Sequence, residues 1–252
     1  MRIAILLLII TASTSLHGQQ RWFEEERNNE GNLLLLNLQY GVHLPGADLN
    51  DRFGTSFSTG VSFDLLTEKN WLLGVQGGFH FGNKVDENVL ASLTGSDGLI
   101  FNDDIFPAEI RLRQRGLAFN AEFGRIFRSN ERSRSGIRAT LGVGFFQHKI
   151  RIQDDPLGKV SSLSGAYKKG YDRLSNGLAT TQFIGYQYLS KNRRINLMIG
   201  MEFTQAWTKN QRSFNFDERS ADTKTRFDLL TGWRIGWTMP FYIGENPDEI
   251  RY

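Results

Sequence analysis

The stretch TKTRFDLLTGWRIGWTMPFY, residues 223–242, decides the fold because its side chains alternate in character from one residue to the next. Successive residues of a β-strand face opposite sides of the sheet, so alternate positions define two faces. One face is mostly large and apolar: Phe227, Leu229, Thr231, Trp233, Ile235, Trp237, Met239 and Phe241. The other is mostly small or charged: Arg226, Asp228, Leu230, Gly232, Arg234, Gly236, Thr238 and Pro240. The stretch therefore predicts a strand between an apolar and a polar environment.

Strand-like alternation recurs along the chain, most clearly outside the segment 174–190. Seven further strands are predicted at 32–44, 55–66, 71–82, 113–127, 136–152, 174–190 and 195–208. Most of these segments reach the roughly 9–11 residues that a tilted strand needs to cross a bilayer. The segment 136–152 changes phase near Phe145 and Phe146, so we expect a β-bulge there.

The connections between these strands alternate strictly in length. The short ones are 67–70, 128–135 and 191–194, and the long ones are 45–54, 83–112, 153–173 and 209–222. An up-and-down membrane barrel has this pattern, with tight periplasmic turns and long extracellular loops. The sequence therefore predicts an all-β chain that forms an eight-stranded antiparallel transmembrane β-barrel, with both termini in the periplasm.

The polar face separates a membrane barrel from a soluble, lipocalin-like barrel. A face in contact with water should be rich in Lys, Glu and Thr, whereas this one is mostly Gly, Ser, Asn and Gln. Small residues suit a narrow interior, and a continuous apolar outer surface is tolerated only in lipid. Aromatic residues also gather near the predicted strand ends, where lipid headgroups lie. They are Trp71, Phe127, Trp237 and Phe241 at one end, and Tyr40, Phe79, Phe81, Trp207 and Phe227 at the other.

Composition excludes several classes of function. The 252 residues carry a net charge of only +3, which gives no field suited to nucleic acid. The absence of Cys excludes disulfides, thiolate metal sites, a cysteine nucleophile and a lipoprotein anchor. No later stretch contains the roughly 20 apolar residues of a membrane-spanning helix.

The two ends of the chain differ from the predicted barrel. Residues 1–18 have the basic start, short apolar core and small-residue end of a signal peptide, which predicts export to the outer membrane. A polar periplasmic leader is expected at 19–31, the barrel at 32–242 and a periplasmic tail at 243–252.

Charged residues on the polar face must lie inside the barrel. Strand parity sends six of them inward: Asp64, Glu122, Arg138, Glu202, Asp228 and Arg234. The interior of an eight-stranded barrel is just wide enough for side chains, and isolated buried charges are costly. We therefore predict a salt-bridge network centred on Glu122, Arg138, Glu202 and Arg234. We interpret it as a structural plug in preference to a gated ion path.

The remaining polar residues offer few candidates for a catalytic or metal site. His43, His80 and His148 are predicted near the outer strand ends, with the hydroxyls of Ser56 and Ser58 nearby. A Ser–His–acid set with Asp48 or Asp51 is one hypothesis, but no motif spacing supports it. The pairs Asp103–Asp104 and Asp154–Asp155 lack the spacing of a Ca²⁺ loop. We expect a non-enzymatic protein without metal or cofactor.

Partner contacts are most strongly indicated by the longest loop. It contains two short apolar runs, with Leu99, Ile100 and Phe101 in the first and Ile105 and Phe106 in the second. Exposed apolar residues on such a loop suggest a protein contact or a lid over the barrel mouth. Lys168 and Lys169 are interpreted as solvated loop residues in preference to a contact with lipopolysaccharide phosphates or a partner. The periplasmic tail is a second candidate docking segment.

Several segments resemble the small outer-membrane β-barrel proteins of Bacteroidota. They are Gln19–Gln20 after the signal, Gly142 to Lys149 (GVGFFQHK), Phe183 to Tyr188 (FIGYQY) and Gly236 to Tyr242 (GWTMPFY). Several small barrels of that group are accessories of the type IX secretion and gliding machinery. The resemblance therefore implies an outer-membrane barrel that acts as a structural or docking component of a secretion complex.

Three functional hypotheses follow from the sequence. The first is a scaffold or docking barrel with protein partners at its loops or tail, surrounded by outer-membrane lipid and lipopolysaccharide. The second is an enzyme that modifies lipid of the outer leaflet, and the third is a narrow, porin-like channel.

Overall fold

The computed structural model of this protein describes residues 31–130, 133–153, 158–190 and 195–243. The expected signal peptide and all but the last residue of the expected leader lie outside the described residues. The expected tail does so too, apart from its first residue, Ile243, which belongs to the last strand.

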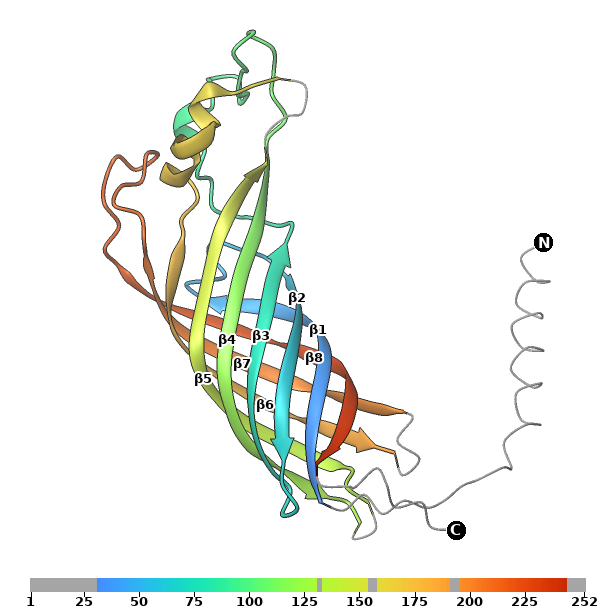
Figure 1. Cartoon of the computed structure of the whole chain (residues 1–252). Helices are drawn as coiled ribbons and strands as arrows, with labels where there is room; N and C mark the ends of the chain where they lie inside the picture. Colours follow the sequence, from blue (N-terminus) through green and yellow to red (C-terminus); the bar gives the residue numbers. More distant parts are fainter. Residues whose placement is uncertain (1–30, 131–132, 154–157, 191–194, 244–252) are drawn as a thin grey trace, which may run out of the picture.

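Eight strands form one closed antiparallel barrel (Figure 1). Each strand pairs with the next along the chain, and β8 pairs with β1 over Asn32–Ala47 to close the sheet. The strands are β1 (Asn32–Ala47), β2 (Ser56–Leu66), β3 (Trp71–Gly82), β4 (Arg111–Arg128), β5 (Gly136–Gln153), β6 (Ser175–Leu189), β7 (Asn196–Asn210) and β8 (Thr225–Ile243). The predicted eight-stranded up-and-down barrel is confirmed, and the largest difference is β1, which continues to Ala47 instead of ending at residue 44.

The predicted bulge in β5 is wrong. Phe145 pairs with Phe119 and Phe146 with Ala118, and the register continues without a slip on either side. Phe146 keeps the inward parity of its strand and is buried inside the barrel. The apparent change of phase arose because an apolar residue occupies an inward position, where a polar one was expected.

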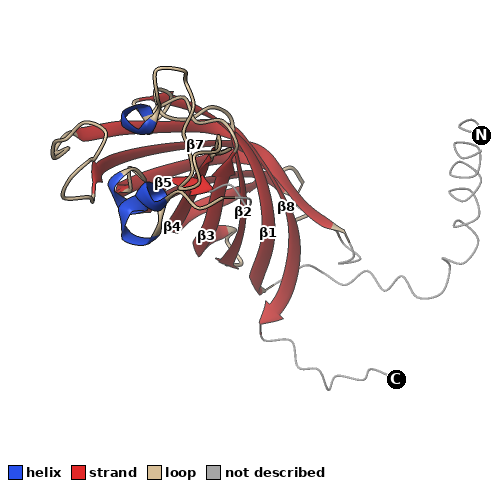
Figure 2. Ribbon diagram, turned by 90° about the horizontal axis from the view of Figure 1, so that it is seen from above, coloured by secondary structure: helices blue, strands red, loops and turns tan. Residues whose placement is uncertain are grey.

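The two ends of the barrel differ. Short turns join β2 to β3, β4 to β5 and β6 to β7 at one end, which we call the turn end. Four long connections occupy the other, which we call the loop end, and their described residues include short 3-10 helices (Figure 2). These helices are η2 (Ala91–Leu93), η3 (Ser161–Leu163) and η4 (Gly165–Gly170). Within the described part of the chain, no helix combines the length and hydropathy that a bilayer crossing requires.

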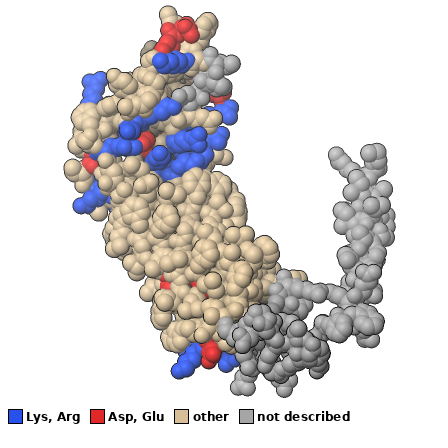
Figure 3. Space-filling model, in the orientation of Figure 1, with Lys and Arg blue, Asp and Glu red and all other residues tan. Residues whose placement is uncertain are grey.

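The outer surface of the barrel is apolar around its middle. Outward residues of successive strands are exposed there, among them Leu73, Phe119, Leu141, Ile184 and Trp233. A continuous band without Lys, Arg, Asp or Glu crosses the visible face, and charged side chains lie beyond both of its edges (Figure 3). Water would not tolerate so large an exposed apolar surface, whereas the hydrocarbon of a membrane matches it.

Candidate functional site: the closed lumen and the loop cap

A network of buried charges fills the middle of the lumen. Arg138 on β5 donates to Asp64 of β2 at 2.8 Å and to Glu122 of β4 at 3.4 Å. Arg234 on β8 contacts Glu202 of β7 in a short ion pair and lies 3.7 Å from Glu122. The structure thus brings together five of the six charges that parity sent inward, and we call these five the lumen network.

Neutral groups add further contacts to this layer. Asn37 donates to Asp64 at 2.8 Å, and Arg234 donates to Gln76 at 2.8 Å. The guanidinium of Arg234 also lies over the ring of Phe183, 4.3 Å from its centroid, in a cation–π contact. Charges excluded from water need such partners, so the layer has the features of a structural plug.

Asp228 lies apart from the lumen network. It is six residues from Arg234 on the same strand, which is about 20 Å along a strand. Its carboxylate accepts from Thr208 at 2.6 Å and contacts Nε2 of His148 at 2.9 Å. Asp228 therefore belongs to a second polar layer, closer to the loop end.

Two histidines flank Phe146 in that second layer, and a third lies beside one of them. The ring centroids of His80 and Phe146 are 5.4 Å apart, and those of Phe146 and His148 are 5.5 Å apart. His43 lies beside His80 with a centroid distance of 5.3 Å. All three imidazoles are buried, so this layer separates the charged middle of the lumen from the loop end.

The hypothesised Ser–His–acid set is only partly present. Ser58 lies 2.8 Å from Nε2 of His43, which is within hydrogen-bonding distance. Nδ1 of His43 has no hydrogen-bond partner among the described residues, and Asp48 instead accepts from the backbone N–H of Phe227 at 2.7 Å. A catalytic set needs a third group to orient the imidazole, and here no carboxylate fills that place.

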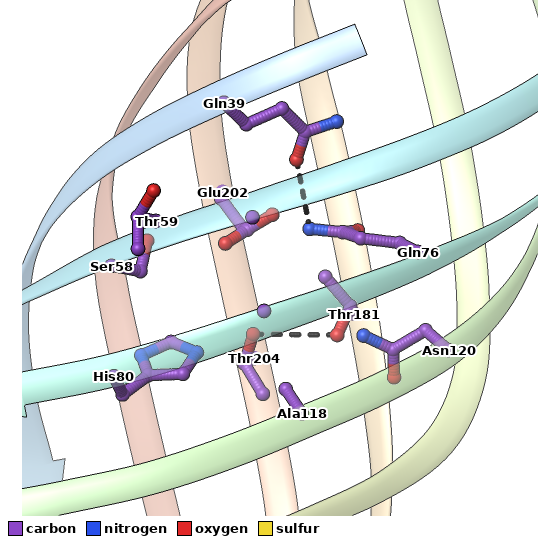
Figure 4. A pocket seen from close by; sticks show the side chains of 12 residues that line it. Gln39, Ser58, Thr59, Gln76, His80, Ala118, Asn120, Thr181, Glu202 and Thr204 are labelled. Carbon is purple, nitrogen blue, oxygen red and sulfur yellow. Dashed lines mark hydrogen bonds between the residues drawn. The ribbon is translucent and has the colours of Figure 1, made fainter. Parts of the chain in front are cut away.

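A small polar pocket lies between the two layers (Figure 4). Gln76 donates to Gln39 at 3.1 Å on one side of it, and the hydroxyls of Thr181 and Thr204 are 3.3 Å apart on the other. Gly60, Gly78 and Ala118, which have little or no side chain, also line the pocket. Its lining is polar enough for water, but it is bounded by side chains of both layers, including Glu202 and His80.

Apolar side chains close the lumen at the turn end. Inward residues of five strands form a buried cluster there: Leu33, Leu35, Leu66, Leu72, Ile126 and Leu189. Arg134, in the turn between β4 and β5, donates to the backbone oxygens of Gly31 and Thr67, each at 2.6 Å. Gly31 directly precedes β1 and Thr67 directly follows β2, so Arg134 links the β4–β5 turn to the ends of these two strands.

A larger apolar cluster closes the loop end. Strand residues such as Phe146, Ile150 and Leu230 pack there against buried residues from the connecting loops. The buried loop residues are Leu49, Phe53, Val89, Leu90, Val160, Leu163 and Tyr171. The loops therefore fold back onto the barrel and form a cap with a core of its own.

Two arginines and two acidic residues, one from each of the four long loops, form ion pairs that connect the loops of the cap. Arg52 of the β1–β2 loop donates to Glu87 of the β3–β4 loop at 2.6 Å. Arg173, just before β6, donates to Glu87 at 2.7 Å and to Asp217 of the β7–β8 loop at 2.6 Å. Burial raises the pKa of the Glu87 carboxyl, but the two guanidiniums outweigh burial and hold this pKa below its ordinary value. We call Arg52, Glu87, Arg173 and Asp217 the loop clamp.

The apolar runs of the longest loop form a small hairpin at the edge of the cap. Asn102 accepts through its side chain from the backbone N–H of Phe106 at 2.8 Å, and Ala108 N–H donates to Ile100 at 2.8 Å. Ile100 packs against the cap core, whereas Leu99, Phe101, Ile105 and Phe106 are exposed. The exposed fraction is largest for Ile105, at 82%, and for Phe106, at 67%.

Ile105 is also strained. Its φ is +67°, in the left-handed region that β-branched residues rarely adopt. The neighbouring Asp103 accepts from the backbone and hydroxyl of Ser161 at 3.0 and 2.6 Å, which fixes the hairpin to the β5–β6 loop. Both carboxylate oxygens of Asp103 are thus engaged by Ser161. No cluster of metal ligands occurs in the part of the chain that the structure covers.

The sequence did not predict the loop clamp. Its members lie in loops, where no periodicity relates one residue to another, and Glu87 and Arg173 are 86 positions apart. The one signal was the presence of arginine and acidic residues beside apolar ones in loops that were otherwise expected to be solvated.

Comparison with known proteins gives similarity of fold only. No protein-family model matches the chain, and no curated protein matches it by sequence. Similar solved structures include Ail, the attachment invasion locus protein of Yersinia pestis, at 9% identity and a TM-score of 0.40, covering 83% of this chain and 99% of Ail. The outer membrane protein OprG of Pseudomonas aeruginosa has 14% identity and a TM-score of 0.40, covering 86% of this chain and 99% of OprG. Neisserial surface protein A has 12% identity and a TM-score of 0.40, covering 82% and 98%. At these values the similarities assign no function to this chain.

Proposed function

We propose that this protein is a non-enzymatic barrel of the outer membrane that presents a rigid extracellular cap to a protein partner. The loop end faces the outside and the turn end faces the periplasm, as in membrane barrels with short periplasmic turns. The proposal rests on one observation: the loop clamp and the apolar cap core fix all four loops in one arrangement. Long loops with such order usually serve recognition.

The contact surface that we propose is the exposed hairpin of the β3–β4 loop. It offers Phe101, Ile105 and Phe106 to solvent on a backbone held by Asn102 and Asp103. The strained backbone at the exposed Ile105 supports a role in contact, because the side chain makes no buried contact that would offset the strain. A secretion complex, which the resemblance to small Bacteroidota barrels suggests, is the first class of partner to test.

Two alternative functions find less support. A channel needs a continuous polar path, whereas apolar clusters close both ends of this lumen. An enzyme of the outer leaflet needs a catalytic set, whereas the pair of His43 and Ser58 lacks an orienting acid among the described residues.

The proposal is tested by photo-crosslinking in living cells. A photoreactive amino acid replaces Ile105 or Phe106 in the full-length protein, and Tyr167, which is exposed elsewhere on the cap, serves as the control position. We expect a discrete protein adduct from positions 105 and 106 and none from 167. Absence of an adduct at both hairpin positions in a folded protein, or stepwise conductance of the purified protein in planar bilayers, would overturn the proposal.

A further inference from the structure

Four basic side chains gather on the outer face of β4 and β5, near the loop end. In the β4–β5 register Arg113 lies opposite Arg151, and Arg115 lies opposite Lys149. All four have the parity of the lipid-facing residues of their strands, and Lys149 and Arg151 are exposed. Lys and Arg side chains accordingly crowd the visible face just beyond the uncharged band (Figure 3). We call these residues the basic patch.

Within the described ranges, the basic patch has no ion-pair partner. Among the described residues, none of its four members forms an ion pair with a carboxylate, and Arg115 instead lies within electrostatic range of Arg113 and Arg151. Other basic residues near this end do have acidic partners. Arg111 pairs with Glu109 at 2.7 Å, Arg226 with Asp222 at 2.7 Å and Lys224 with Asp48 at 3.7 Å.

Two directly opposed like-charged pairs destabilise a sheet unless an anion joins them. The fold does not require these charges, because outward positions of the same strands accept Leu117 and Phe119 a few residues away. An external anion between the two strands would turn this repulsion into charge-assisted hydrogen bonds.

The height of the patch indicates where the anion comes from. Arg115 is two residues from Leu117, and Lys149 is four residues from Phe145, both of which are exposed in the apolar band. Two residues of a strand span about 7 Å, so the patch begins where hydrocarbon gives way to headgroups. Phe81 of β3 pairs with Arg115 and adds an aromatic ring at the same height.

We propose that the basic patch binds the phosphate groups of a phosphorylated glycolipid in the outer leaflet. Arginine side chains recognise phosphate through two parallel hydrogen bonds, and each basic residue near a membrane surface adds attraction to anionic lipid. The acyl chains of the same lipid would lie against the apolar band below. This site is on the outside of the barrel and is independent of the partner contact proposed for the hairpin.

The test measures binding of lipid A to the full-length protein in nanodiscs of zwitterionic lipid. The variant replaces all four patch residues by Gln (Arg113→Gln, Arg115→Gln, Lys149→Gln and Arg151→Gln). The control removes four exposed charges elsewhere (Lys69→Gln, Lys84→Gln, Arg128→Gln and Arg219→Gln). We expect the patch variant to bind bisphosphorylated lipid A at least about tenfold more weakly and the control variant to bind it like the unmodified protein.

Two further arms identify the source of the anion. Dephosphorylated lipid A should bind the unmodified protein as weakly as bisphosphorylated lipid A binds the patch variant, and inorganic phosphate at equal concentration should not compete. Equal binding by the patch variant, equal binding of dephosphorylated lipid, or full competition by inorganic phosphate would each overturn the proposal. Should the fourfold variant fail to fold, as judged by heat-modifiable gel mobility, the Arg115→Gln/Lys149→Gln pair gives the same readout.

Discussion

The lumen network and the loop clamp are both built from arginines and carboxylates, but on different kinds of backbone. Arg138 and its acidic partners sit on strands whose positions the ladder of the barrel already fixes. Arg173 and its partners sit on loops that no ladder holds, and the ion pairs themselves bring these loops together. The first network therefore compensates charges that are buried inside the barrel. The second network orders the loop surface that we propose for docking.

The largest effect is expected in the lumen network. Arg138→Met leaves Asp64 buried without its cation and Glu122 with Arg234 alone, at 3.7 Å, and the free energy of unfolding should fall by about 3–5 kcal/mol. Urea unfolding of the protein in lipid vesicles, followed by tryptophan fluorescence, measures this change.

A rescue variant separates lost charge pairing from lost packing. Adding Asp64→Asn and Glu122→Gln to Arg138→Met removes the uncompensated charges and should restore most of the lost stability. Arg125→Met, at an outward position over Trp71, is the matched control and should cost no more than about 1 kcal/mol. Equal losses for Arg138→Met and Arg125→Met would mean that the lumen network contributes nothing specific.

The strand-borne half of this comparison was predictable from sequence. Parity alone placed Asp64, Glu122, Arg138, Glu202 and Arg234 inside the barrel, because each strand sends every second side chain inward. Parity says nothing about height along the strand, which is why Asp228 was grouped with Arg234, which lies about 20 Å away along the same strand. The bulge was wrongly predicted because the sequence does not show that Phe146 belongs to an inward apolar layer. In the sequence alone, an apolar residue at an inward position looks the same as a change of phase.

The second effect concerns the loop clamp. Glu87→Gln removes the charge shared by Arg52 and Arg173, and the cap should lose about 1–3 kcal/mol of local stability while the barrel stays intact. Hydrogen–deuterium exchange should become faster in all four long loops and remain unchanged in the strands.

The control for this variant is Asp86→Asn. Asp86 is the adjacent residue of the same loop, and it forms an exposed pair with Lys84 at 3.4 Å, so its loss should hardly alter exchange. Faster exchange confined to the β3–β4 loop of Glu87→Gln would show that the clamp holds only that loop and would contradict the four-loop arrangement.

Acidification should open the cap before it affects the barrel. The pKa of Glu87 is held below its ordinary value of 4.5, so its stabilising contribution is complete above that value and is lost as pH falls through the lower, folded-state pKa. Because the chain has no Cys, Ser96→Cys and Ser213→Cys allow two spin labels to report the distance between the β3–β4 and β7–β8 loops. We expect the distance distribution to broaden as the pH is lowered stepwise from 6 to below 4.5, and Glu87→Gln should already be broad at pH 6. A distribution that does not change with pH would remove Glu87 from the clamp.

The smallest effect is expected at Ile105, which belongs to neither network. Its left-handed φ of +67° suits Asn better than a β-branched residue, and its side chain is too exposed to lose much packing. Ile105→Asn should therefore stabilise the hairpin by up to about 1 kcal/mol, seen as slower hydrogen exchange around it. The same variant should weaken the adduct formed by a photoreactive residue at position 106. A hairpin that gains stability while it loses its partner would show that Ile105 serves contact at the expense of folding, as functional residues often do. A loss of stability would instead place Ile105 among the residues that hold the cap together, and the proposed contact surface would then rest on Phe101 and Phe106 alone.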